Sequence, residues 1–342
     1  MDHRHLDKKI IADQMQIVND VAGAWKVQVL YALIELDIFE ILNDQKLTTE
    51  EIGSRVHVPV VSLERLLNGA VSTGYLRKHQ NGYENTPTAN QVLVKGKPGY
   101  LGNYLKLTAR WNRSFGKLGR AVRSNEPVED ANAMADEEYR TLFIKGMIDY
   151  AAYRGTDVLN HIDLEDRKRL IDIGCGPAVY TEMFASAYPQ LRCTAYDLPD
   201  ALAIARERIR TKEETGQNRL EWKPGNYLTD DSYGTGFDVV FLSHVLHQES
   251  PEDCRRILKK SFHALNPGGV LIIQAMFLSE DGLGSVYTAL HDLLALLIFP
   301  GGYNYSKETM IPWLEALDYV NIRSTSMSMH NINSLILADK ER

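Results

Sequence analysis

A short apolar run that enters a glycine-rich turn constrains the fold of this chain more than any other feature. The run Leu170–Ile173 is followed by Gly174 and Gly176, and a helix is expected to follow the turn. The next apolar run, Leu191–Tyr196, ends in Asp197. Glycines let the backbone pass close to a ligand, and the acid is placed to accept hydrogen bonds from both hydroxyls of a ribose. The pattern therefore predicts the first half of a nucleotide-binding βαβ unit.

Two residues around this turn indicate which nucleoside cofactor it holds. A dinucleotide fingerprint ends in a third glycine, and this chain has Val179 at that position. Asp172 lies on the strand just before the turn, where a carboxylate would repel a pyrophosphate but would suit an amino group and a sulfonium centre. We therefore expect S-adenosylmethionine as the cofactor, in preference to a turn with a purely structural role.

The composition restricts the possible partners and the compartment. The chain has 342 residues, a net charge of -7 and a pI of about 5.8, which disfavours a nucleic-acid-binding scaffold. Its three cysteines, Cys175, Cys193 and Cys254, show neither close pairing nor metal-ligand spacing, which indicates a reducing compartment. The polar N-terminus does not resemble a signal peptide, and the most apolar run, Leu293–Phe299, is too short to span a bilayer. We expect a soluble, cytoplasmic protein with no nucleic-acid or membrane partner.

The N-terminal third has the residue spacing of helices. From Ile10 to Leu42, apolar residues recur at helical intervals and form a stripe wider than one packed face requires. Such a helix is either central to its own domain or partly buried against another chain.

A winged-helix pattern follows. Thr48 is a candidate cap for a short helix, Pro59–Thr73 predicts a second helix, and an Asn-Gly turn within Gln80–Tyr83 predicts a hairpin. A domain of this kind can bind DNA, or it can serve dimerisation or pocket closure. The helix that would enter the DNA groove carries only Arg65, offset by Glu64, whereas phosphate binding needs several positive charges. We therefore expect dimerisation or pocket closure.

The rest of the chain predicts a helical connector and a doubly wound α/β sheet closed by a final hairpin. Aromatic residues are dense between Tyr100 and Tyr153, which is more typical of a helical core than of a pocket but is compatible with a planar-substrate cavity. Glu126–Asp136 is expected to be an exposed loop. The expected helices are Ala201–Thr215, Pro251–Leu265 and Lys307–Leu317, and the expected strands are Leu220–Lys223, Phe237–Ser243, Val270–Ala275, Tyr319–Ser326 and Ser334–Ala338.

Six motifs occur in the order seen in one family of enzymes. They are Asp172–Gly176, Tyr196–Pro199, Gly225–Leu228, His247–Cys254, Leu265–Gly269 and Pro300–Gly302. With these motifs the chain resembles, over nearly its whole length, the small-molecule O-methyltransferases of the plant caffeate and bacterial antibiotic-tailoring type. The resemblance implies a homodimer with an N-terminal winged-helix dimerisation domain at residues 1–105. It also implies a class I (Rossmann-like) methyltransferase domain at residues 106–342, which begins with a helical connector at 106–160.

The resemblance further implies which residues bind S-adenosylmethionine. The two glycines of the turn would lie beside its methionyl part and Asp197 beside its ribose. Asn226 and Tyr227 would lie near the adenine, where the family usually has an aspartate followed by an apolar residue. Ser243 stands where plant members often have a lysine. The implied set is Asp172, Gly174, Gly176, Asp197, Leu198, Gly225, Asn226, Tyr227 and Ser243.

His247 aligns with the general base of the family. A phenol has a pKa of about 10, and an imidazole with a pKa near 6.5 can take its proton as the methyl group transfers, which raises rates by about 10² to 10⁴. Its place at the carboxyl end of an expected strand fits that role, and the alternative is a histidine that only caps the strand. His244 is expected to pack beside the site.

Several positions depart from the family pattern. The base is usually followed by Asp-Trp, and here it is followed by Gln248 and Glu249. Plant members flank the base with two glutamates, and the matching positions here are Gln274 and Asn304. Without a carboxylate partner the imidazolium is less stabilised, so His247 should be a weaker base. Three explanations stay open: an acidic acceptor, assistance from Glu249, or different chemistry.

A second histidine, His291, lies on the expected helix Ser285–Ile298, whose counterpart in the family lines the acceptor pocket. With His247 it could hold a metal or an anionic substrate, but only Asp292 and Glu249 are near in sequence to complete a metal site. We expect contact with a polar acceptor and no metal. The expected acceptor-pocket residues are His291, Gln274, Asn304 and Gln248.

These features predict transfer of a methyl group from S-adenosylmethionine to a hydroxyl of a small aromatic metabolite, by direct displacement with His247 as the base. One alternative is methylation of carbon or nitrogen, including a 2-oxo acid assisted by His247 and His291. Another is a winged-helix regulator that senses a nucleoside ligand.

Overall fold

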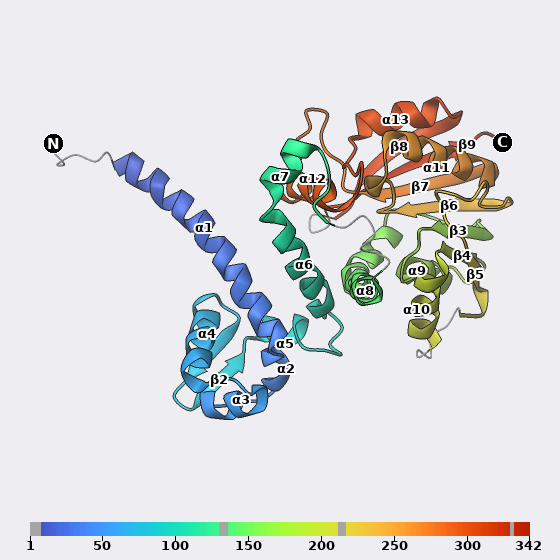
Figure 1. Ribbon diagram of the computed structural model, residues 1–342. Helices are drawn as coiled ribbons and strands as arrows, with labels where there is room; N and C mark the ends of the chain where they lie inside the picture. Colours follow the sequence, from blue (N-terminus) through green and yellow to red (C-terminus); the bar gives the residue numbers. More distant parts are fainter. Residues whose placement is uncertain (1–7, 130–135, 211–216, 329–331) are drawn as a thin grey trace. The chain divides into compact units, whose positions relative to one another are not determined.

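Two units make up the chain in the computed structural model, Met1–Ala109 and Arg110–Arg342. The structure describes residues 8–129, 136–210, 217–328 and 332–342 (Figure 1). The division falls within helix α6 (Gly102–Phe115), whereas the sequence placed the domain boundary after residue 105.

The N-terminal unit is helical and carries one small hairpin. Its elements are α1 (Lys8–Glu35), α2 (Ile38–Ile41), α3 (Thr49–Val56), α4 (Val60–Ser72), β1 (Leu76–His79), β2 (Gly82–Asn85), α5 (Pro87–Val92) and the start of α6. Thr48 and Glu51 form a capping box at the start of α3, in which each side chain accepts the backbone N–H of the other residue. His79 pairs with Gly82, so the hairpin turns over two residues. The predicted succession of helix, helix and hairpin is confirmed.

The long N-terminal helix ends earlier than the sequence pattern predicts. The expected helix from Ile10 to Leu42 is two helices, α1 and α2, because Asp37 between them adopts a left-handed conformation with φ 51°. The C-terminal end of α1, at Leu33 and Ile34, packs into the core of this unit.

The rest of α1 exposes apolar side chains. By length and composition α1 could cross a membrane, a test that core helices and signal sequences also pass, and only 11% of its most apolar 18-residue stretch is buried. The sequence expectation, which rested on Leu293–Phe299, overlooked this helix because polar residues interrupt its apolar run. Its exposed apolar residues are Ile10, Ile11, Met15, Ile17, Val18, Val21 and Trp25.

The second unit is built on a seven-stranded mixed sheet with the order β5-β4-β3-β6-β7-β9-β8 (Figure 1). Five strands are parallel, and β9 and β8 form the antiparallel hairpin that the sequence predicts. The predicted α/β class is confirmed. The strands are β3 (Arg169–Ile173), β4 (Arg192–Asp197), β5 (Leu220–Pro224), β6 (Phe237–Ser243), β7 (Leu265–Ala275), β8 (Tyr319–Ser326) and β9 (Ser334–Lys340).

Helices cover both faces of this sheet because alternate strand residues point to opposite sides. Ile171 and Val240 pack in a core with α11 (Pro251–Ala264) and α13 (Lys307–Glu315), whereas Leu170 and Phe241 pack in a second core with α8 and α9. The remaining helices are α7 (Leu118–Ser124), α8 (Glu137–Leu159), α9 (Val179–Ala187), α10 (Pro199–Arg210) and α12 (Val286–Ile298), with 3-10 turns η2 (Gln217–Arg219) and η3 (Leu246–Gln248).

Two predicted segments differ from the structure, and parts of two segments lie outside the described residues. β7 begins at Leu265, directly after α11, so the Asn-Pro-Gly-Gly segment belongs to the strand instead of separating it from the helix. The loop from Glu126 is not simply exposed, because the backbone N–H groups of Val128 and Glu129 donate to the Leu297 carbonyl. Residues 130–135 of that loop and residues 211–215 of the expected helix Ala201–Thr215 lie outside the described residues.

Candidate functional site

The glycine turn between β3 and α9 closes tightly against the neighbouring strands. Gly174 and Gly176 have φ of 68° and 52°, conformations that favour glycine. A Cβ on Gly174 would also lie 2.7 Å from a methyl group of Val245. The Gly174 N–H donates to the Tyr196 carbonyl on β4 at 2.9 Å. Two independent constraints, backbone conformation and space, therefore require glycine at position 174.

Asp197 ties the end of β4 to this turn. Its Oδ2 accepts the Gly176 N–H and its Oδ1 accepts the Leu198 N–H, each at 2.7 Å. Burial raises the pKa of this carboxyl, and the two N–H donors act against that shift. Each oxygen keeps a lone pair that can accept a further hydrogen bond, so the carboxylate suits a vicinal diol.

Asp172 is a buried acid beneath the turn, with 1% of its surface exposed. Its Oδ2 accepts from the Thr181 hydroxyl at 2.6 Å, whereas Oδ1 has no partner among the described residues. Burial, and after it the nearby charge of Asp197, raise the pKa of Asp172 to about 7. An unpaired, buried carboxylate oxygen fits a ligand that brings a positive charge.

A buried ion pair supports the same turn from α10. The guanidinium of Arg208 donates to the Pro177 carbonyl at 3.0 and 3.2 Å and lies 2.6 Å from the Glu182 carboxylate on α9. Neither Arg208 nor Glu182 belongs to a sequence motif. No local signal could have found them, because Arg208 and Pro177 are 31 positions apart and meet only when α10 packs beside the turn.

The loop after β5 brings Tyr227 against the glycine turn. A Cβ on Gly225 would lie 2.5 Å from the Tyr196 ring, so glycine permits the close approach of this loop. Asn226 uses its side-chain oxygen to accept the Leu228 N–H at 2.9 Å, which leaves one lone pair for a ligand. Carbons of the Tyr227 ring lie 3.6 and 3.7 Å from the place of a Cβ on Gly174.

His247 lies in η3, beyond the carboxyl end of β6, and is 9% exposed. Its ring stacks on that of His291, with 5.0 Å between centroids and 17° between planes, and the His244 ring lies 5.6 Å away. Its Nδ1 has no partner among the described residues. Burial, and after it the neighbouring histidines, hold the pKa of His247 well below its ordinary value, so the ring is neutral at pH 7.

The expected pocket residues fall into two groups. His291 and Asn304 contact one another at 3.2 Å beside His247, and burial lowers the pKa of His291 to about 4. Gln274 is instead engaged by the hydroxyls of Ser243 and Tyr180, at 3.2 and 3.1 Å.

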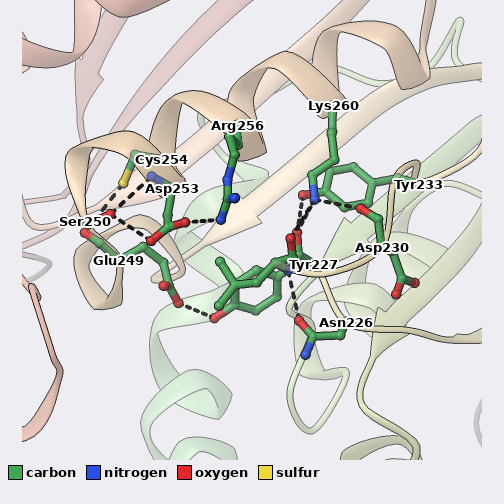
Figure 2. A network of polar contacts seen from close by, with 11 residues as sticks. Asn226, Tyr227, Asp230, Tyr233, Glu249, Ser250, Asp253, Cys254, Arg256 and Lys260 are labelled. Carbon is green, nitrogen blue, oxygen red and sulfur yellow. Dashed lines mark hydrogen bonds and ion pairs between the residues drawn. The ribbon is translucent and has the colours of Figure 1, made fainter.

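Gln248 and the two acidic residues near this pocket, Asp292 and Glu249, also have hydrogen-bond partners. Gln248 donates to the His244 carbonyl at 2.8 Å, and the carboxylate of Asp292 accepts the Asn304 N–H at 2.7 Å. Glu249 accepts a hydrogen bond from the Tyr227 hydroxyl at 2.7 Å (Figure 2). Among the described residues, no three His, Cys, Asp or Glu side chains are grouped so that they could hold a metal ion.

Family models match most of this architecture. Residues 110–311 match the O-methyltransferase domain, and residues 19–95 match the O-methyltransferase dimerisation domain. The chain belongs to the O-methyltransferase family. The expected resemblance and S-adenosylmethionine as the cofactor are thereby confirmed. The protein is an S-adenosylmethionine-dependent O-methyltransferase, and the winged-helix regulator was the wrong alternative.

Individual relatives of this O-methyltransferase align over nearly their full length. The 3-hydroxy-5-methyl-1-naphthoate 3-O-methyltransferase of Streptomyces sahachiroi is 28% identical over 331 residues, 95% of each chain. The L-tyrosine C(3)-methyltransferase of Streptomyces lavendulae is 28% identical over 303 residues, 84% of this chain and 81% of the relative. The crystal structure of human N-acetylserotonin methyltransferase in complex with SAM superposes with a TM-score of 0.87 at 24% identity and covers 100% of both chains, so the fold is shared.

Proposed function

We propose that this O-methyltransferase methylates a hydroxyl of a small aromatic metabolite, with His247 as the general base. The supporting observation is a buried, neutral imidazole beyond β6 whose Nδ1 has no partner among the described residues. A neutral ring nitrogen would take the proton of the acceptor hydroxyl while that oxygen forms its bond to the methyl carbon, the bond from that carbon to the sulfonium sulfur breaks and S-adenosylhomocysteine leaves. The proton then resides on the imidazole of His247.

We infer that the glycine turn and the loops after β4 and β5 hold the cofactor. When bound, S-adenosylmethionine supplies a methyl group attached to a positively charged sulfur. The lone pairs left on Asp197 suit ribose hydroxyls, and the unpaired oxygen of Asp172 suits positive charge. The cofactor residues are Asp172, Gly174, Gly176, Asp197, Leu198, Gly225, Asn226, Tyr227 and Ser243.

The acceptor is an aromatic compound with an acidic hydroxyl. The groups nearest the base, His291 and Asn304, are neutral, so no carboxylate helps His247 to hold a proton. A more acidic hydroxyl needs less help from the base. The relative at 28% identity is named for a hydroxynaphthoate, which supports an aromatic acceptor.

A second candidate is methylation of carbon. The relative named for C(3) of L-tyrosine supports it. Position-specific analysis of the methylated product, by the carbon chemical shift of the new methyl group, separates an O-methyl from a C-methyl product.

We further propose a cytoplasmic homodimer. The match to a dimerisation domain at residues 19–95 includes the C-terminal part of α1, whose apolar residues Val21 and Trp25 are exposed in the single chain. The buried thiols of Cys175, Cys193 and Cys254 are free, which fits a reducing compartment.

The base is tested by replacing His247 with alanine. Turnover of labelled S-adenosylmethionine, in a screen of phenols and hydroxynaphthoates, should fall at least about tenfold, because positioned base catalysis accounts for that much or more. Affinity for S-adenosylhomocysteine, measured by calorimetry, should change little. His263→Ala, at an exposed histidine on α11, is the matched control. Unchanged turnover of His247→Ala would remove this residue from the mechanism.

A further inference from the structure

A hydrogen bond between Tyr227 and Glu249 joins the cofactor side of the site to the base side. The Tyr227 hydroxyl donates to Oε1 of Glu249 at 2.7 Å (Figure 2). Tyr227 follows β5, and Glu249 directly follows η3, the turn that carries His247.

The Tyr227 end of this bond is held firmly. Its backbone carbonyl accepts from the Lys260 ammonium at 2.6 Å and from the Tyr233 hydroxyl at 2.9 Å. Its ring lies against Gly174 of the glycine turn. The tyrosine ring therefore spans the space between the cofactor turn and Glu249, and its hydroxyl is the atom that reaches the base-bearing segment.

The Glu249 end is continuous with the turn that sets His247. The Glu249 N–H donates to the Leu246 carbonyl at 3.3 Å, which closes η3, and the Glu249 carbonyl accepts from the Tyr305 hydroxyl at 2.7 Å. A displacement of Glu249 would therefore change the closure of η3 and with it the placement of the His247 ring. The hydrogen bond from Tyr227 thus connects the loop after β5 to the residue that closes η3.

We propose that Tyr227 and Glu249 are a positioning pair that couples occupancy of the cofactor loop to the orientation of His247. The proposal rests on the cofactor and base roles inferred above. A ligand that binds against the Tyr227 ring displaces the tyrosine hydroxyl. Because Glu249 accepts a hydrogen bond from that hydroxyl, Glu249 moves with it and changes the closure of η3. His247 is then set for proton transfer only when the cofactor loop is occupied.

The test uses NMR to follow the ring resonances of His247 as S-adenosylhomocysteine is added. These resonances are assigned by their loss in His247→Ala. In the wild-type protein the ligand should shift these resonances. Tyr227→Phe and Glu249→Ala should each abolish the shift, while the dissociation constant rises by no more than about tenfold, the effect of one hydrogen bond. Glu249→Gln keeps an acceptor oxygen and should restore the shift. Tyr319→Phe, which removes a buried hydroxyl bonded to the Leu258 carbonyl, is the matched control and should retain it.

Two outcomes would overturn the coupling: a shift that persists in Tyr227→Phe, or a loss in Glu249→Gln equal to that in Glu249→Ala. A wild-type protein that binds the ligand without any change at His247 would overturn it as well. Failure of the proposed function has a different signature. Absence of calorimetric binding to the wild-type protein contradicts the cofactor site, and full turnover by His247→Ala contradicts the base.

Discussion

Burial acts on the key titratable residues of this O-methyltransferase by disfavouring their charged forms. The pKa of Asp172 rises to about 7, and that of His247 falls well below its ordinary value. Near neutrality the site therefore holds a carboxyl close to its titration midpoint under the glycine turn and an uncharged imidazole beyond β6. Both states suit their proposed tasks, since one accommodates positive charge and the other accepts a proton.

Replacement of Asp172 by asparagine should stabilise the free protein and weaken cofactor binding. A raised carboxyl pKa means that the folded state loses stability as pH rises from about 4 to 7, because the unfolded chain gives up the proton first. At pH 8 the variant should melt several degrees higher than the wild type. Its affinity for S-adenosylhomocysteine should fall about tenfold or more, because a charged partner is lost. Calorimetry and thermal unfolding at pH 5 and pH 8 check both effects, and a variant less stable at pH 8 would contradict the prediction.

The two stacked histidines should make the fold sensitive to acid. Their pKa values are lowered in the folded state, to about 4 for His291, so below about 6.5 the unfolded chain binds protons that the folded chain does not. The contribution of the two histidines to the free energy of unfolding should therefore decrease as pH falls through this window, by at most about 1.4 kcal/mol per pH unit for each histidine, whereas the contribution of Asp172 changes in the opposite direction. Urea unfolding between pH 7 and pH 5 measures the slope. His291→Asn should make the slope shallower, whereas His263→Asn, at an exposed position, should leave it unchanged.

Sequence motifs predict the identity of some site residues, whereas the contacts of others depend on the tertiary structure. The glycines are recognisable because a tight turn imposes their type at fixed offsets, and the proposed cofactor roles of Asp172 and Asp197 come from the same short motif. The engagement of Gln274 by Ser243 and Tyr180 was not predictable, since it depends on strand register and on the packing of α9.

At the scale of elements, the glycine turn between β3 and α9 is held by helices α9 and α10. α9 begins after Ala178, which has a φ of 55° and whose side chain makes no capping hydrogen bond. α10 contributes Arg208, which donates to the Pro177 carbonyl inside the turn. A residue that is distant in sequence therefore stabilises the turn through hydrogen bonds.

Arg208→Met should loosen this turn. The substitution removes both hydrogen bonds to Pro177 and leaves the Glu182 carboxylate buried without its ion-pair partner. We expect affinity for S-adenosylhomocysteine to fall about tenfold and stability to fall by about 3 kcal/mol. Arg210→Met is the matched control, because Arg210 pairs with Glu207 on the exposed face of the same helix. Equal effects of the two substitutions would contradict a specific role of Arg208 in holding the turn.

Element boundaries reflect tertiary structure more than local preference. The apolar pattern continues from Ile10 to Leu42, but the chain turns at Asp37 so that Ile38 and Phe39 can enter the core of the N-terminal unit. The stop signal Asn266–Gly269 falls inside β7, where the register with β6 shifts between the pairs Phe237–Leu265 and Val239–Val270.

At the scale of the whole molecule, α1 is the clearest sign of a partner. A helix that buries only 11% of its most apolar stretch exposes surface that a second chain can cover. Val21→Glu combined with Trp25→Glu should convert a dimer into a monomer, because two charges would be buried at the interface. Light scattering coupled to size exclusion measures the mass. Gln16→Glu, a polar position on the same helix, should leave the dimer intact, and a dimeric double variant would place the interface elsewhere.

The sequence by itself determined the strand-turn-helix motif, the doubly wound sheet, the winged-helix pattern and the family, because each follows from residue types at short, fixed spacings. Tertiary structure alone decided which side chains meet. It stacked His247 on His291, directed Glu249 to Tyr227 and brought Arg208 to Pro177. These contacts join residues 22 to 44 positions apart, and they form only after sheet order and helix packing have fixed where each segment lies.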